Sequence, residues 1–160
     1  MRRLELKHIA PYLPYGLKVT FEGDDLTHEV VGINIWTEGV ELLSPFNDYG
    51  QADIEDCRPI LRPLSDLDKN ITHKGKTFNP IKDLIKMPIT KESNALMAFY
   101  SLNTIGVGKY LEDVANYGDI NPKYLSYPLA QKLMEWHFDI YGLIDDGLAI
   151  DINELKEELR

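Results

Sequence analysis

The chain has 160 residues, of which 44% are hydrophobic and 27% are charged, and this composition excludes a disordered or low-complexity protein. Cys57 is the single cysteine, which excludes an internal disulfide and argues against a disulfide-stapled secreted scaffold. The formal net charge of −9 argues against broad, nonspecific binding to nucleic acid, because such binding needs a dense cationic surface.

The charge is unevenly distributed. Residues 1–60 carry 5 Lys/Arg and 11 Asp/Glu (net −6), residues 61–110 carry 8 and 4 (net +4), and residues 111–160 carry 4 and 11 (net −7). Segments of opposite sign are expected to pack beside each other. The basic middle leaves a small, local contact with nucleic acid open as an alternative.

Two features bear on location. The first residues are charged but lack the apolar region of a signal peptide. The longest uncharged stretch, residues 93–108, is too short and too polar to span a bilayer. The sequence therefore predicts a cytoplasmic protein without membrane contact.

The first residues predict a short helix and an apolar hook. Residues 4–10 form a candidate helical turn, which Pro11 and Pro14 are expected to end because proline lacks the amide donor. Residues 11–16 form an apolar segment that contains Tyr12 and Tyr15, and we expect this segment to pack on the domain that follows it in the sequence.

Residues 17–44 predict an antiparallel meander of three strands. Apolar and polar residues alternate over 17–22, the period of a half-buried strand. In the second strand, residues 26–36, Val31, Ile33 and Ile35 are expected on one face, and Gly32 marks a bulge or bend.

A loop with a short helical turn is expected over residues 44–56, followed by a strand over 57–61 that Pro59 places at a sheet edge. Short strands, tight turns and a helical turn before the last strand are similar to a small SH3-like barrel. The predicted fold class is α+β, with a small antiparallel N-terminal β-barrel (SH3-like) over residues 1–62 and a mainly helical C-terminal part over residues 63–160. The two parts are expected to pack as one compact unit.

In the second part, Ser65 is a candidate cap for a short helix. A hairpin with a glycine turn is expected over residues 71–78. Asn79 followed by proline predicts the cap of a helix over residues 80–86. Residues 91–117 are apolar without a clean period, so strand and helix compete there.

The clearest helical pattern covers residues 128–141, where apolar residues recur at spacings of three and four. Gly142 is expected to end that helix. Asp151, with a glutamate three residues later, resembles a capping box for a final helix over residues 155–160.

No pattern of known chemistry is complete. Gly106 to Lys109 resembles part of a phosphate loop, but the first glycine and the Ser/Thr of the full motif are missing. No histidine has a second metal ligand at the usual spacing. We therefore expect no metal site and no cofactor. A hydrolase or transferase centred on His137 or Cys57 remains an alternative, because either residue could act beside a suitable partner.

The number of aromatic residues is the simplest indication of function, and it points to a protein interface. Tyr12, Tyr15, Trp36 and Tyr49 belong to a larger aromatic set than one core needs. Aromatic side chains with polar tips are enriched at interfaces. These four residues predict a surface for a protein partner or for self-association.

Lysines in the basic middle support a second interpretation. Lys74, Lys76 and Lys82, together with Phe78, combine cations with an aromatic ring that could stack on a base. Their spacing fits no named nucleic-acid module. A nucleic-acid-associated module is therefore the alternative prediction.

Three stretches carry a family resemblance: Ile9-Ala10-Pro11-Tyr12-Leu13-Pro14-Tyr15-Gly16-Leu17, then residues 58–67, and residues 136–151. Together they resemble an uncharacterised protein family encoded by Bacteroidetes and their phages or prophages. The resemblance covers most of the chain. That family has no established activity, so the resemblance implies no functional residue. It implies an intracellular, phage-related accessory role, and we expect a non-enzymatic protein that binds a protein partner through aromatic and acidic surface.

Overall fold

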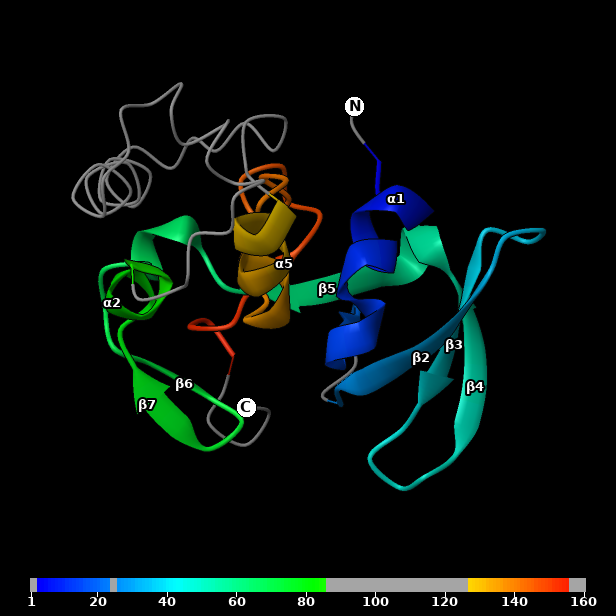
Figure 1. Ribbon diagram of the computed structural model, residues 1–160. Helices are drawn as coiled ribbons and strands as arrows, with labels where there is room; N and C mark the ends of the chain where they lie inside the picture. The colour runs from blue at the N-terminus through cyan, green and yellow to red at the C-terminus, as the bar shows by residue number, and fades with distance from the viewer. Residues whose placement is uncertain (1–2, 24–25, 86–126, 156–160) are drawn as a thin grey trace. The chain divides into compact units, whose positions relative to one another are not determined.

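The computed structural model describes residues 3–23, 26–85 and 127–155 (Figure 1). The chain divides into two compact units. The first unit is built from the residues up to Arg62 and from Met134 onwards, and the second runs from Pro63 to Leu133. The second unit is therefore an insertion in the sequence of the first.

The first unit contains a mixed sheet of six strands in the order β4-β3-β2-β1-β5-β8. Its strands are β1 (Lys18–Phe21), β2 (His28–Asn34), β3 (Gly39–Leu43), β4 (Tyr49–Asp53), β5 (Cys57–Leu61) and β8 (Ile150–Asp151). Neighbouring strands are antiparallel except β5 and β8, which pair in parallel at Ile60 with Ile150 and at Leu61 with Asp151.

The expected closed, SH3-like barrel is wrong. The three-strand meander forms as expected, but within the described residues the sheet stays open, with β4 and β8 at its two edges. Closure into a barrel would require the two edges of the sheet to pair with each other. The free side of β5 instead pairs with β8 from the C-terminal segment, which gives a mixed open sheet.

The expected mainly helical C-terminal part is also wrong for the described residues. Beyond residue 62 the α-helices are α2 (Pro80–Ile85) and α5 (Tyr127–Glu135), while β6 (Ile71–His73), β7 (Lys76–Phe78) and β8 are strands. The two helices are short, and the segment after α5 consists of turns and the strand β8.

The helix expected over residues 128–141 ends at Glu135. His137 takes a left-handed φ of 60°, a conformation in which an α-helix does not continue. The backbone then pairs with Arg62, whose N–H donates to the carbonyl of His137 at 2.7 Å and whose carbonyl accepts from the N–H of Asp139 at 2.8 Å. Apolar residues after Glu135, such as Phe138 and Ile140, are therefore buried from a non-helical segment, and the predicted stop at Gly142 is wrong.

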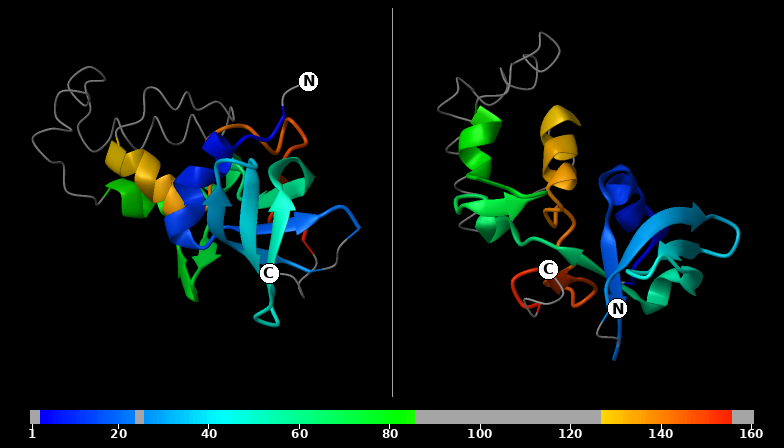
Figure 2. Two further views of the ribbon diagram at one scale, coloured as in Figure 1. Left: turned by 90° about the vertical axis from the view of Figure 1, so that its right-hand side faces the viewer. Right: turned by 90° about the horizontal axis from the view of Figure 1, so that it is seen from below.

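The N-terminal α-helix ends before Pro11, as predicted, but the chain continues as a 3-10 helix through both prolines. Helix α1 (Leu6–Ile9) continues directly into the 3-10 helix η1 (Ala10–Tyr15), which includes Pro11 near its start and Pro14 inside it. The segment ends at Gly16, whose φ of 74° suits glycine. Figure 2 shows α1 and η1 on one side of the sheet strands of the first unit.

A β-bulge in β2 changes which side chains are buried. The register shifts between Val30 and Gly32, so Val31 is an extra residue without a direct partner. The predicted bulge is confirmed, but the predicted shared face of Val31, Ile33 and Ile35 is wrong. Val30 is buried, whereas the exposed fractions of Val31 and Ile35 are 43% and 71%.

Residues 44–56 contain more structure than the sequence predicts. The helical turn is confirmed as the 3-10 helix η2 (Ile54–Asp56), but β4 precedes it. The next strand, β5, forms as predicted but lies inside the sheet and not at its edge. Pro59 is tolerated there because β8 pairs only with the two following residues, Ile60 and Leu61.

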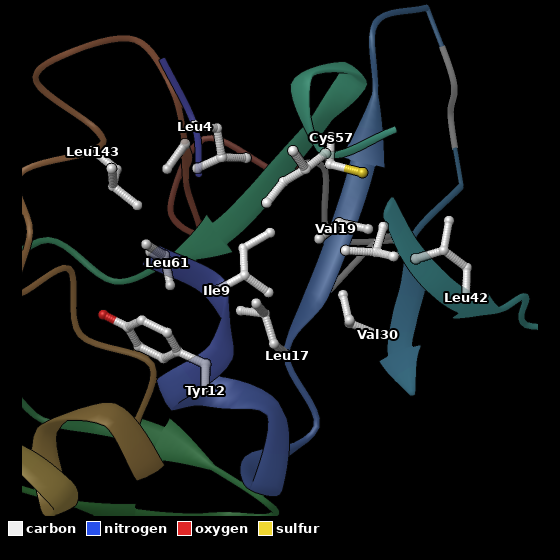
Figure 3. Packing of buried hydrophobic residues seen from close by; sticks show 13 residues of the cluster. Leu4, Ile9, Tyr12, Leu17, Val19, Val30, Leu42, Cys57, Leu61 and Leu143 are labelled. Atoms are coloured by element: carbon white, nitrogen blue, oxygen red, sulfur yellow. The ribbon is translucent and has the colours of Figure 1, made fainter. Parts of the chain in front are cut away.

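The core of the first unit lies between the α1–η1 segment and the sheet (Figure 3). Its buried members come from both sequence segments of the unit: Leu4, Ile9, Tyr12, Leu17, Val19, Val30, Val40, Leu42, Ile54, Cys57, Leu61, Leu143 and Ala149. The Tyr12 hydroxyl donates to the carbonyl of Phe138 at 2.7 Å, so it too connects the N-terminal and C-terminal segments.

The second unit is described from Pro63 to Ile85 and from Tyr127 to Leu133. The hairpin β6–β7 and helix α2 confirm two predictions. Asn79 caps α2, because its Oδ1 accepts from the N–H of Lys82 at 3.0 Å. The predicted cap at Ser65 is wrong, since that residue lies within the 3-10 helix η3 (Leu64–Asp66). The predictions for residues 91–117 and for a final helix over 155–160 fall outside the described residues, except for Leu155.

Candidate protein-interaction surface

Two of the predicted interface tyrosines belong to the interior or its border. Tyr12 is 0% exposed, and burial raises its pKa well above the ordinary value. Tyr15 is half-buried, and its carbonyl accepts a hydrogen bond from Nε2 of His137 at 3.2 Å. Tyr12 therefore offers no side-chain surface to a partner.

The other two predicted residues are among the most exposed apolar side chains of the first unit. The exposed fractions are 91% for Trp36 and 81% for Tyr49, and Ile35 and Phe46 are each 71% exposed. Ile35 and Phe46 are not predicted as surface residues, because nothing in the sequence distinguishes them from core residues. Several large, exposed apolar side chains on one surface are typical of interaction sites.

Local hydrogen bonds position the two turns that carry these side chains. In the turn between β2 and β3, Asn34 Oδ1 accepts from the N–H groups of Trp36 at 3.0 Å and Thr37 at 3.3 Å. In the turn between β3 and β4, Ser44 Oγ accepts from the N–H groups of Phe46 at 3.2 Å and Asp48 at 3.1 Å. Such side-chain-to-backbone bonds fix turn geometry.

The two turns lie at opposite ends of β3 (Figure 1). Trp36 and Tyr49 therefore do not form one cluster. They border the face of β2, β3 and β4 that points away from the core, which we call the outer face. Direct partners across antiparallel strands point to the same side, so Tyr49 lies beside Leu43, and Gln51 beside Glu41, on this face.

The outer face and its surroundings are acidic. Residues 19–57 contain ten Asp/Glu and no Lys or Arg. Six of these acidic residues lie in or next to β3 and β4 and are exposed: Glu38, Glu41, Asp48, Asp53, Glu55 and Asp56. Among them, Glu55 has a cation beside it, since Arg3 Nη1 lies 2.9 Å from its carboxylate in an exposed pair, and such pairs neutralise little.

Cys57 has the environment of a core residue and not that of a nucleophile. It is 2% exposed, and its thiol donates to the carbonyl of Asp53 at 3.4 Å. Burial, reinforced by the charges of Asp56 and Asp53, raises its pKa to about 12, so the thiol is protonated at neutral pH. Among the described residues, no three His, Cys, Asp or Glu side chains form a group that could hold a metal ion.

A thiol reagent is expected to leave Cys57 unmodified at pH 8 in the folded protein and to modify it in urea. The folded pKa of about 12 lies above the ordinary value of 9.0. The stability that comes from keeping this thiol neutral is therefore complete below about pH 9 and is lost as the pH rises towards 12. Absorbance of a released thiol chromophore measures both states, and rapid labelling of the folded protein at pH 8 would contradict the assignment.

The lysines of the nucleic-acid alternative lie in the second unit. Lys74 is exposed in the turn of the β6–β7 hairpin, and Lys76 is exposed on β7. Lys82 is exposed on α2, while Phe78 is half-buried. The hairpin turn brings Lys74 and Lys76 close together, and nucleic-acid binding there stays a prediction.

Comparison with protein-family models, curated proteins and solved structures finds no match for the chain. The resemblance to a Bacteroidetes and phage family therefore stays a prediction. No helix among the described residues is both long and apolar enough to cross a membrane.

Proposed function

We propose that the protein is a non-enzymatic, cytoplasmic accessory protein that binds a protein partner through the outer face of β2, β3 and β4 and the two turns that border it. One observation supports this proposal above all. Four highly exposed apolar side chains lie within residues 19–57, a segment that contains no Lys or Arg: Ile35, Trp36, Phe46 and Tyr49. Aromatic side chains supply binding energy at interfaces, and charge of one sign selects a partner of opposite charge.

The resemblance to a phage and prophage family supports a role in modifying a host process, and the partner is then a host or phage protein with a basic surface. Buried Cys57 and the hydrogen-bonded His137 give no support to the hydrolase or transferase alternative.

The test compares capture of a partner by matched variants. The double variant Trp36→Ala/Tyr49→Ala removes one aromatic side chain at each end of the outer face. Each anchor contributes on the order of 1–2 kcal/mol at a typical interface, so the double variant is expected to reduce capture at least about tenfold. Immobilised protein is incubated with nuclease-treated host lysate, and bound proteins are quantified by mass spectrometry.

The matched control is Tyr127→Ala, which removes an aromatic side chain of similar exposure, 74%, from the second unit. A protein retained by the wild type and by this control, but lost with the double variant, supports the proposal. Equal retention by all three proteins, or recovery of nucleic acid alone, would overturn it.

A further inference from the structure

Strand β4 is an edge of the sheet. It pairs with β3 on one side, and no described strand pairs with its other side. Figure 1 shows β4 at the border of the β2–β3–β4 group. Tyr49, Gly50, Gln51 and Asp53 are all exposed.

The hydrogen bonds at the two ends of the β3–β4 ladder show which backbone groups of β4 face away from β3. The N–H of Ser44 donates to the carbonyl of Asp48 at 2.9 Å, and the N–H of Ile54 donates to the carbonyl of Glu38 at 3.2 Å. In an antiparallel ladder, hydrogen-bonded and non-hydrogen-bonded pairs alternate. The N–H and C=O groups of residues 50 and 52 therefore face β3, and those of Tyr49, Gln51 and Asp53 face away from it.

Most of these outward groups are available. The carbonyl of Asp53 accepts from the Cys57 thiol, which leaves the N–H and C=O groups of Tyr49 and Gln51 as a ready set of two donors and two acceptors. Their strand is already held extended by five residue pairs with β3. An exposed edge of this kind is a template for an added strand.

Two kinds of strand could pair with the free edge of β4: a second copy of β4, or a strand of another protein. Charge distinguishes between them. A second copy of β4, aligned antiparallel about Gln51, would place Asp53 opposite Tyr49 of the other copy and would bring two copies of the acidic segment 19–57 against each other, each with ten Asp/Glu and no Lys or Arg. Like charge on the two surfaces opposes their association. A strand with Lys or Arg at alternate positions would instead place its cations beside these carboxylates.

We propose that the partner contributes an extended, basic segment that pairs with the free edge of β4 as an added strand. This proposal rests on the proposed function and specifies its mode. The segment hydrogen-bonds to Tyr49 and Gln51, and its alternate Lys or Arg side chains lie over the outer face, near Asp53 and Glu41.

The decisive variant is Gln51→Pro, with Gln51→Ala as its control. Proline removes the outward N–H of residue 51 but none of the hydrogen bonds to β3, and proline is tolerated at that position of an edge strand. Circular dichroism and thermal unfolding establish that both variants are folded. The probe is a fluorescent nine-residue peptide of alternating lysine and valine, and binding is measured by fluorescence anisotropy.

We expect Gln51→Ala to bind the peptide like the wild type and Gln51→Pro to bind it at least tenfold more weakly. A peptide of the same sequence with N-methyl groups on every second residue keeps all side chains and charges but loses one edge of donors, and its binding is also expected to fall at least tenfold. In the wild-type complex, the amide protons of Tyr49 and Gln51 become protected from exchange.

Equal binding of the normal and N-methylated peptides, or of both residue-51 variants, would overturn edge pairing, and absence of peptide binding would overturn the basic alternating occupant. A concentration-dependent dimer that Gln51→Pro abolishes would replace the partner segment by a second copy. These outcomes differ from failure of the proposed function. If capture of the host protein depends on Trp36 and Tyr49 but is unchanged by Gln51→Pro, only the edge-pairing mode fails.

Discussion

Asp139→Ala is expected to lower the free energy of unfolding by about 3 kcal/mol, because it removes the acceptor of one buried and two partly buried hydrogen bonds from backbone amides. Asp139 is 4% exposed. Its Oδ1 accepts from the N–H of Leu143 at 2.9 Å and of Tyr141 at 3.3 Å, and its Oδ2 accepts from the N–H of Ile144 at 2.8 Å. One carboxylate thus organises the turn that carries Leu143 into the core.

Urea-induced unfolding followed by tryptophan fluorescence measures this loss. Trp136 is 5% exposed and reports on burial, whereas Trp36, at 91% exposed, changes little. Asp145→Ala, an exposed carboxylate on the same segment, is the control and is expected to change stability by less than about 0.5 kcal/mol. Asp139→Asn keeps one acceptor oxygen and should fall between the two. Equal stability of the two alanine variants would show that the turn does not depend on the carboxylate.

Leu17→Ala is also expected to cost about 3 kcal/mol of unfolding free energy, since it creates a cavity in the core as well as removing apolar contacts. Leu17 is 0% exposed, and Figure 3 shows its side chain next to Ile9 of α1, with Val30 of β2 nearby. The cavity would separate the helical segment from the sheet, so the loss should affect the whole first unit.

Leu26→Ala is the matched control, because it is the same substitution at a side chain that is 37% exposed. We expect it to cost less than about 1 kcal/mol. The same urea titration compares the two variants by their midpoints. A smaller loss for Leu17→Ala than for Leu26→Ala would contradict the position of the core.

Local patterns predict local structure well in this chain. The strand within residues 17–22, the bulge in β2, the β6–β7 hairpin and the Asn79 cap all depend on residues close in sequence, and all are confirmed, although Thr20 is buried on the face that the alternation predicts to be polar. Strand β4 is missed because Gly50 and Asp53 are residue types that are depleted in strands. It forms because the adjacent β3 supplies a partner for every one of its residues.

Contacts between distant residues could not be predicted from the sequence. Strand β8 has only two residues, and its partner β5 lies about ninety residues earlier. The end of α5 depends in the same way on Arg62, which pairs with the backbone around Phe138. The mistaken barrel and the mistaken long helix both follow from these two long-range pairings.

Sequence and structure agree only in part on the candidate surface. Trp36 and Tyr49 can be named from the sequence and are highly exposed. Tyr12 has the same kind of side chain but lies in the core, because residue type alone does not report burial. The bulge accounts for the exposure of Val31, because the extra residue leaves Val30 and Ile33 on the core side. Ile35 is exposed because it lies beyond the end of β2, in the turn to β3.

The interrupted first unit has a consequence for the chain as it leaves the ribosome. Strand β5 is synthesised before residues 63–133, and β8 only after them. At about 5–20 residues per second, the nascent chain waits several seconds for the strand that completes this side of β5. Throughout that time the nascent sheet lacks Leu143 and Ala149 from its core. Chains released before Met134 therefore expose apolar surface and become substrates for chaperones and proteases.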